Sequence, residues 1–316
     1  MLHQAYKKTG QHPLPAFRTN EKLNDPQLYI PSAGLVDAVN VALTLGQPLL
    51  LTGDPGTGKT ELAWHIAYQF QLGGELDEET KEMVYKPLVF TAQTTSTATD
   101  LFYKYDAVGH FQYNQNNKIP LSIEEIEARY IHYNALGEAI RRQERGVVLI
   151  DEIDKAPRDL PNDILFAIER LSFKVPELKN KEYKTHKALR PIILLTSNSE
   201  KNLPDAFLRR VVYYHIPPPS PIELLEILRL KTDNFTKSER EQIVDHFNDV
   251  LEMGLKKKPA TAELIYWALL LKDLDFPINQ LGKKLAPADK QKLDMSYSVL
   301  AKNRDDLELL KNKLGK

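Results

Sequence analysis

The chain of 316 residues is 42% hydrophobic and 27% charged, a composition typical of a globular protein with two or three domains. Its 42 Lys and Arg residues nearly balance its 43 Asp and Glu residues, so the net charge of -1 gives no strong overall field that favours nucleic acid or a membrane. A local charged patch stays open, and the net charge names no partner. The absence of cysteine excludes disulfides and thiolate metal sites, and no apolar run is long enough to span a bilayer.

Residues 1–30 contain Pro13, Pro15 and Pro26 and show little periodicity, so we expect an N-terminal extension. The segment lacks the apolar core of a signal peptide. Together with the absence of cysteine, this leads us to expect a cytoplasmic protein without membrane insertion.

A glycine-rich segment at residues 53–60 fits the phosphate-binding pattern G-x-x-x-x-G-K-[ST] in full. It stands between an apolar strand pattern at 48–52 and a helical pattern at 61–70, as the motif requires. Glycine allows the positive backbone angles with which successive N–H groups converge on phosphate oxygens. We predict that Lys59 bridges the outer phosphates of a nucleotide and that Thr60 holds Mg²⁺, with a chance glycine turn as the alternative. The predicted nucleotide-binding residues are Gly53, Asp54, Pro55, Gly56, Thr57, Gly58, Lys59, Thr60 and Glu61.

The next stretch is longer than a minimal nucleotide-binding core needs. Residues 86–91 have the pattern of the second core strand. We expect a helix at 97–108 that begins near a Thr or Ser cap, and a polar, turn-rich segment at 109–120. Ser122 and Glu125 then form a capping-box pattern that predicts another helix. These features indicate an insertion beside the second helix.

An apolar run at residues 147–150 ends in two acids, Asp151 and Glu152. This is the pattern of a buried parallel strand whose carboxyl end opens into a crevice. We predict that Asp151 is an outer-shell partner of Mg²⁺ and that Glu152 is the general base for the water attacking the terminal phosphate. A solvated acidic turn is the alternative.

Downstream, residues 171–177 and 183–187 flank a polar turn and predict a β-hairpin, a second insertion. A third apolar strand at 191–196 is followed by Asn198, whose amide could position the attacking water, although Asn at a strand end is also a common turn former. Arg209 and Arg210 close a short helical pattern, where an arginine pair by itself is explained by the helix dipole.

In this order the motifs at 53–60 and 147–152, Asn198 and the arginine pair resemble the core of an AAA+ ATPase, over about residues 30–275. The resemblance implies an α/β P-loop NTPase core, a parallel five-stranded sheet between helices with helix and β-hairpin insertions, followed by an all-helical lid. It implies ATP and ADP as the nucleotides and Asn198 as the sensor-1 residue. It also implies that Arg209 or Arg210 is an arginine finger that reaches the site of a neighbouring subunit.

The two insertions, and the segments TTSTATDLFYKYDA at 94–107 and KKPATAELIYWALLL at 257–271, resemble the MoxR-like and dynein-related branch. The resemblance implies a homo-oligomeric ring, expected to be a hexamer, that remodels or chaperones a protein client, often with a partner that carries a von Willebrand factor A domain. One position departs from the family pattern: Ala262 stands where a sensor-2 arginine is common. Sensor 2 therefore stays unassigned, with the lysine run at 256–258 as an alternative source of the cation.

Prolines at 217–219 and 221 mark a boundary, because proline cannot continue a strand ladder. Beyond them, Thr236 and Glu239 form a capping-box pattern, and further helical patterns occupy 262–274 and 290–314. The predicted domains are the N-terminal extension at 1–30, the α/β nucleotide-binding domain at 31–217 and the helical lid at 218–316.

Three functions remain open from sequence. The leading hypothesis is Mg²⁺-dependent ATP hydrolysis in a ring, coupled to remodelling a protein partner. The second is an ATP-dependent assembly switch in a signalling or defence complex with slow hydrolysis, which the alanine at position 262 keeps open. The third, a nucleic-acid translocase, is disfavoured by the neutral net charge and the lack of an obvious basic stripe.

Overall fold

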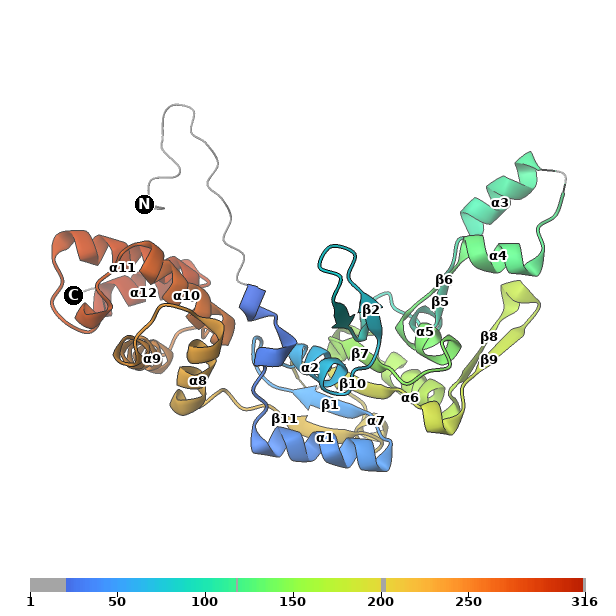
Figure 1. Cartoon of the computed structure of the whole chain (residues 1–316), viewed down its shortest axis with the longest axis horizontal. Helices are drawn as coiled ribbons and strands as arrows, with labels where there is room; N and C mark the ends of the chain where they lie inside the picture. Colours follow the sequence, from blue (N-terminus) through green and yellow to red (C-terminus); the bar gives the residue numbers. More distant parts are fainter. Residues whose placement is uncertain (1–20, 118, 200–202, 315–316) are drawn as a thin grey trace. The chain divides into compact units, whose positions relative to one another are not determined.

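The computed structural model describes residues 21–117, 119–199 and 203–314, so residues 1–20 of the predicted N-terminal extension lie outside the described part (Figure 1). The described chain divides into two compact units. The first comprises residues 31–53 and 58–216, and the second comprises residues 21–30, 54–57 and 217–314. Within the described ranges, no helix has the length and apolar character needed to cross a membrane.

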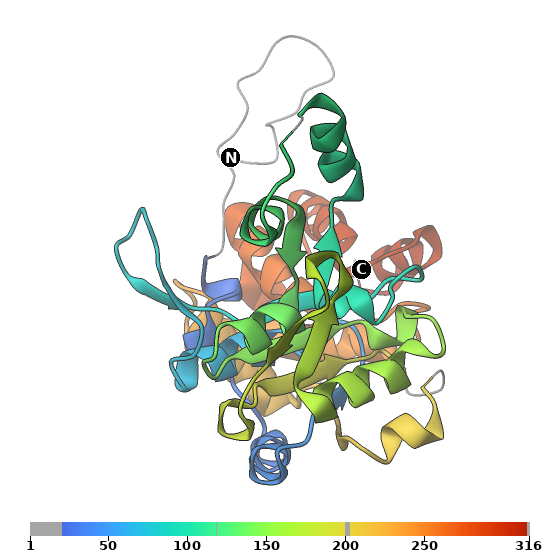
Figure 2. The same ribbon diagram turned by 90° about the vertical axis from the view of Figure 1, so that its right-hand side faces the viewer.

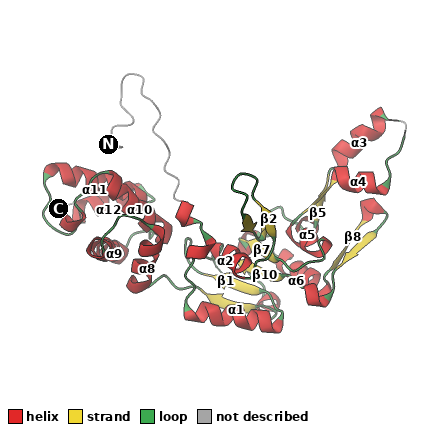
Figure 3. Ribbon diagram, viewed as in Figure 1, coloured by secondary structure: helices red, strands yellow, loops and turns green. Residues whose placement is uncertain are grey.

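The first unit is built on a parallel sheet of five strands, whose strands are yellow in Figure 3. Their order is β11-β1-β10-β7-β4. Leu50, in the second strand of this order, pairs in register with Leu195 on one side and Tyr213 on the other. The inner strands are buried almost throughout, as in parallel sheets covered on both faces. The predicted sheet is thus confirmed. Its strands are β1 (Leu49–Thr52), β4 (Leu88–Thr91), β7 (Val147–Asp151), β10 (Ile192–Thr196) and β11 (Val212–His215).

Helices of the first unit pack on this sheet, α1 against β1 and β11, and α2 and α5 against β7. The side chain of Ser32 caps the start of α1, and the left-handed Gly46 ends it with a φ of 61°. Buried aliphatic side chains from the strands and from α5 and α6 form one continuous core. The helices are α1 (Ala33–Leu45), α2 (Glu61–Gln69), α5 (Ala135–Arg141), α6 (Leu160–Arg170) and α7 (Asp205–Leu208).

The helix predicted at 97–108 is wrong. The structure has a short 3-10 turn (Thr99–Leu101) and then a strand, β5 (Tyr103–Tyr105), which pairs antiparallel with β6 (Ile131–Tyr133). Long-range pairing with a strand far along the chain outweighs the local helical pattern, as aromatic-rich segments favour strands.

The turn-rich segment predicted at 109–120 is also largely wrong, because α3 (Ala107–Asn116) covers most of it. Asp106 accepts a hydrogen bond from the backbone N–H of Gly109 and so caps this helix. The helix predicted after residue 122 is confirmed as α4 (Ile123–Tyr130), with both hydrogen bonds of its capping box formed.

Two further hairpins leave the sheet. The predicted one is confirmed as β8 (Ser172–Val175) and β9 (Lys181–Lys184). The other was not predicted: β2 (Gly74–Leu76) and β3 (Met83–Tyr85) form a small antiparallel pair that projects away from the sheet (Figure 2).

The second unit is helical and has its own core. Trp267, Tyr297 and Phe247 are its largest fully buried side chains. Capping boxes at Ser220 and Thr236 begin its first two helices. The helices are α8 (Pro221–Lys231), α9 (Lys237–Glu252), α10 (Thr261–Asp273), α11 (Pro287–Leu300) and α12 (Arg304–Lys313).

The helical pattern at 290–314 predicts one continuous helix, and this is wrong in one respect. The structure has two helices there, α11 and α12. The chain leaves the helix at residues 301–303, and Asn303 caps α12 by accepting a hydrogen bond from the backbone N–H of Asp306. An Asn side chain that satisfies the backbone locally favours such a break.

Candidate nucleotide-binding and hydrolysis site

The loop between β1 and α2 has the backbone shape that phosphate binding requires. Gly53, Gly56 and Gly58 have φ angles of 147°, 78° and 85°, a region that side chains rarely adopt. Within the loop, the Thr57 hydroxyl donates a hydrogen bond to the Asp54 carbonyl oxygen at 2.9 Å, which stabilises the turn. Glycines at these positions let successive backbone N–H groups face one point at the start of α2, where the helix dipole favours an anion.

Lys59 and Thr60 complete the end of this loop. The Lys59 side chain is only 8% exposed, and its Nζ donates a hydrogen bond to the Gly53 carbonyl oxygen at 2.8 Å. Burial of an ammonium group is costly unless it has partners. The hydrogen bond therefore holds the lysine against the start of the loop, and its role in binding phosphate stays a prediction.

Thr60 and Asp151 meet at the same edge of the sheet, although they are 91 positions apart. The Thr60 hydroxyl lies 3.3 Å and 3.5 Å from the two carboxylate oxygens of Asp151. A hydroxyl beside a carboxylate is an oxygen-rich pair that suits Mg²⁺. The two side chains present therefore fit a magnesium ion, which they would hold.

Thr196 was not predicted from the sequence, yet its hydroxyl links the two acidic residues. It donates a hydrogen bond to Asp151 Oδ1 and accepts one from the backbone N–H of Glu152 at 3.0 Å. The residue is 1% exposed at the end of β10, the strand next to β7. The sequence feature that could have identified Thr196 is a polar residue at the end of an otherwise apolar strand.

Glu152 has an unusual backbone conformation. Its φ of 58° and ψ of 43° are left-handed, which costs free energy in a non-glycine residue and is common at functional sites. Its carboxylate pairs with Lys155 Nζ at 2.7 Å, and this hydrogen bond raises the pKa of the Lys155 ammonium. The carboxylate predicted to act as a base is thus held by a neighbouring cation.

Asn198 lies just after β10, near the acidic residues. Its side chain is exposed, and its backbone N–H donates to Asp154 Oδ1 at 3.4 Å. The strand order places it on the same edge of the sheet as Asp151 and Glu152. Its role as the residue that positions water stays a prediction.

The remaining predicted residues lie at element ends. Arg209 is the residue after α7, and both it and Arg210 are exposed and have no carboxylate partner in the described part of the chain. Glu61 is the first residue of α2, where an acidic side chain suits the helix N-terminus. Ala262 lies in the first turn of α10, in the second unit.

Comparisons with known proteins show what this chain is similar to. A family model described as an AAA domain of the dynein-related subfamily matches residues 48–211. No curated protein matches the chain. Among solved structures, the Holliday junction branch migration motor RuvB of Thermotoga maritima has 15% identity and a TM-score of 0.44, covering 87% of this chain and 69% of that one. The FIGL-1 AAA domain in complex with ADP has 15% identity and a TM-score of 0.42, and the match covers 90% of this chain and 89% of that one.

The family model includes the glycine-rich loop, both acids at the end of β7 and the arginine pair after α7. It matches more than half of the chain. The chain therefore belongs to the AAA domain family, in its dynein-related subfamily.

Proposed function

We propose that this protein hydrolyses ATP with Mg²⁺ in an oligomeric ring and uses the energy to remodel or chaperone a protein client. The main observation in support is one cluster at the carboxyl edge of the sheet. There the hydroxyls of Thr60 and Thr196 lie beside the Asp151 carboxylate, and the Glu152 backbone N–H joins them. A P-loop with such a cluster has the parts that phosphoryl transfer needs.

The proposed roles follow from where each side chain lies. The loop N–H groups and Lys59 bind the phosphates, and Thr60 and Asp151 hold the magnesium ion. When bound, the ion neutralises charge on the phosphate oxygens. Glu152 takes a proton from the attacking water, which Asn198 orients through its amide. ATP and ADP are the proposed nucleotides.

The proposed ring rests on the arginine pair. Arg209 and Arg210 are exposed and have no carboxylate partner within the described ranges. An exposed arginine at this position can reach the nucleotide of an adjacent subunit and stabilise charge on the phosphoryl group. We propose a hexamer, with one of the two arginines as the finger.

The client and partner are proposals from the sequence resemblance. The MoxR-like segments favour a protein client and a partner with a von Willebrand factor A domain, in the cytoplasm. The net charge of -1 gives no support to a nucleic-acid client.

The test is ATP turnover measured over a range of protein concentrations for three proteins: wild type, Glu152→Gln and the double variant Arg209→Ala/Arg210→Ala. Specific activity should rise with concentration in the wild type and be lost in both variants. Activity that is independent of concentration and indifferent to the arginines would mean that each chain hydrolyses ATP alone, and the ring would have to be abandoned.

A second candidate is an assembly switch in which ATP binding builds a complex and hydrolysis is slow. The ion pair between Glu152 and Lys155 favours it, because a carboxylate bound to a cation is less available to water. ATP-dependent assembly in sedimentation experiments with turnover below about one per minute would support this candidate; the median enzyme turns over about ten times per second.

A further inference from the structure

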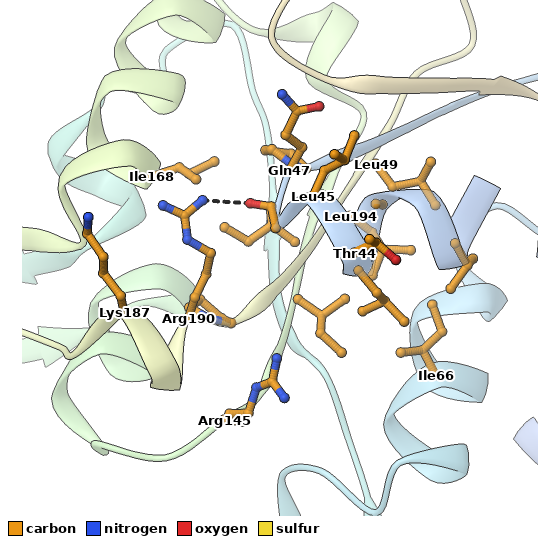
Figure 4. A pocket seen from close by; sticks show the side chains of 18 residues that line it. Thr44, Leu45, Gln47, Leu49, Ile66, Arg145, Ile168, Lys187, Arg190 and Leu194 are labelled. Atoms are coloured by element: carbon orange, nitrogen blue, oxygen red, sulfur yellow. Dashed lines mark hydrogen bonds between the residues drawn. The ribbon is translucent and has the colours of Figure 1, made fainter. Parts of the chain in front are cut away.

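A pocket of about 390 Å³ lies at the amino ends of the parallel strands (Figure 4). The end of α1, the starts of β1 and β10, and side chains from α2 and α6 line it. The phosphate-binding loop follows β1 at its carboxyl end, so this pocket lies at the opposite end of the sheet. All of its lining residues belong to the first unit.

The body of the pocket is aliphatic. Of the described residues that line it, none is acidic and none carries an aromatic ring. Leu45 at its edge is 61% exposed, so apolar surface continues from the interior to the mouth. The volume is within the range of small-molecule sites, which are mostly apolar with a few polar groups that fix orientation. The principal aliphatic side chains are those of Leu43, Leu45, Leu49, Ile66, Ile168 and Leu194.

Three basic side chains, Arg145, Lys187 and Arg190, add charge to this lining. In Figure 4 they lie on one side together with Ile168, with Leu49, Leu194 and Ile66 on the other. The three charges are thus gathered on one side of the pocket, and the aliphatic wall formed by Leu49, Leu194 and Ile66 lies across from them.

These cations lack carboxylate partners in the described part of the chain, unlike basic residues close to them in sequence. Arg141 and Arg142 both bind the Glu138 carboxylate, at 2.9 Å and 2.8 Å. Arg190 donates one hydrogen bond to the Gly46 carbonyl oxygen at 2.6 Å, which caps the end of α1 and leaves its other N–H groups for a ligand. Unpaired cations in a concave site concentrate anions.

We propose that this pocket binds a small amphiphilic anion, with a carboxylate or phosphate head on an aliphatic body. The head contacts Arg145, Lys187 and the remaining donors of Arg190, and the body lies against the aliphatic wall. Charge-assisted hydrogen bonds to such a head are the stronger kind. A second nucleotide does not suit the site, because the lining has no ring on which a base would stack. This site is independent of ATP hydrolysis.

The test uses three probes of equal chain length, decanoate, decyl phosphate and decylamine, titrated calorimetrically into the full chain without nucleotide. One or both anions should bind with one site per chain, and the amine should bind at least about tenfold more weakly. The tighter anion identifies the head group. Failure of both anions to bind below about 1 mM, or equal binding of the amine, would overturn the proposal.

The cations are tested with Arg145→Gln/Lys187→Gln, which should weaken anion binding about tenfold or more. The matched control is Lys283→Gln/Lys284→Gln, which removes the same charge from exposed residues of the second unit. An equal loss in both double variants would show a general charge effect and refute the site.

A second pair of variants tests the pocket without removing charge. Thr44→Trp places a large ring at an exposed lining position, and Asn40→Trp places it one turn earlier, outside the lining. Only Thr44→Trp should reduce binding, and if both or neither do so the proposed location is wrong.

Discussion

At the residue scale, the end of β7 places two adjacent acids in different surroundings. Asp151 faces two threonine hydroxyls, whereas Glu152 turns into a left-handed conformation and pairs with Lys155. The first arrangement suits a metal ligand, and the second suits a side chain whose position must be controlled. Asp151 and Glu152 are adjacent in the sequence, yet their different contacts suit them to different proposed roles.

Thr196 should act as a positioning residue for both acids. Thr196→Val keeps the shape but removes the acceptor for the Glu152 N–H and the donor to Asp151, and a buried unpaired group costs about 1–3 kcal/mol. We expect kcat for ATP to fall by about ten- to a hundredfold, with a smaller change in KM. Steady-state kinetics measure this split, and Thr196→Ser should restore most of kcat. Wild-type kcat in the valine variant would show that the link has no catalytic consequence.

Lys155 should restrain Glu152. Lys155→Met removes the ion pair, so the carboxylate becomes more available to water. We expect kcat to increase about two- to fivefold, a modest change because ion pairs of exposed side chains are weak. Turnover at saturating ATP measures it, and Lys174→Met, at an exposed lysine of β8, is the control. A decrease in kcat would instead show that Lys155 holds Glu152 in its working position.

At the element scale, the packing of helices in the second unit lowers the pKa of a buried histidine. His246 of α9 is 3% exposed, stacks on Trp267 of α10 and lies 2.9 Å from the Tyr297 hydroxyl of α11. Burial lowers the pKa of His246 from 6.5 to about 4. The helices therefore pack around an uncharged ring.

This burial predicts a pH dependence of stability. Between pH 6.5 and pH 4 the unfolded chain binds a proton that folded His246 does not, so stability falls as the pH falls through this window. The loss should be about 2 kcal/mol between pH 7 and pH 5. Urea unfolding at both pH values measures it.

His246→Phe should remove this part of the pH dependence, whatever its effect on stability at pH 7. His132→Phe, at an exposed histidine of β6, should keep it. An unchanged pH slope in His246→Phe would assign the effect to other groups.

At the scale of the whole molecule, nucleotide binding should stabilise the folded chain. A ligand at about 100 times its Kd adds about 2.7 kcal/mol to the free energy of unfolding. Thermal unfolding with Mg-ATP, compared with buffer, should show this increase in wild type. Lys59→Ala should lose most of it, because the buried Lys59 ammonium is the cation that we propose to bind the phosphates, whereas Ala262→Arg should retain it and also retain turnover. Full stabilisation or retained hydrolysis in Lys59→Ala would contradict the assignment of the site.

Local patterns in the sequence predicted much of the fold. Continuous apolar runs marked β1, β7 and β10, since buried parallel strands need no polar face. The capping boxes at Ser122 and Thr236 marked the starts of α4 and α9, because the hydrogen bonds that define them span only three residues. The spacing of glycines likewise predicted the sharp turn between β1 and α2, where Gly53, Gly56 and Gly58 have positive φ angles; phosphate binding by this loop stays a prediction.

Only the tertiary structure decided features that depend on distant partners. The strand β5 replaced an expected helix because it pairs with β6, and Thr196 joined the site because β10 lies beside β7. The pocket at the amino ends of the strands is lined by residues from α1 to β10, which lie far apart in the sequence and share no local pattern. The sequence by itself determined the elements whose signals are local, namely apolar periodicity, caps and the glycine turn. Tertiary structure decided strand pairing, side-chain ionisation and which distant charges come together. These features depend on interactions between segments that lie far apart in the chain.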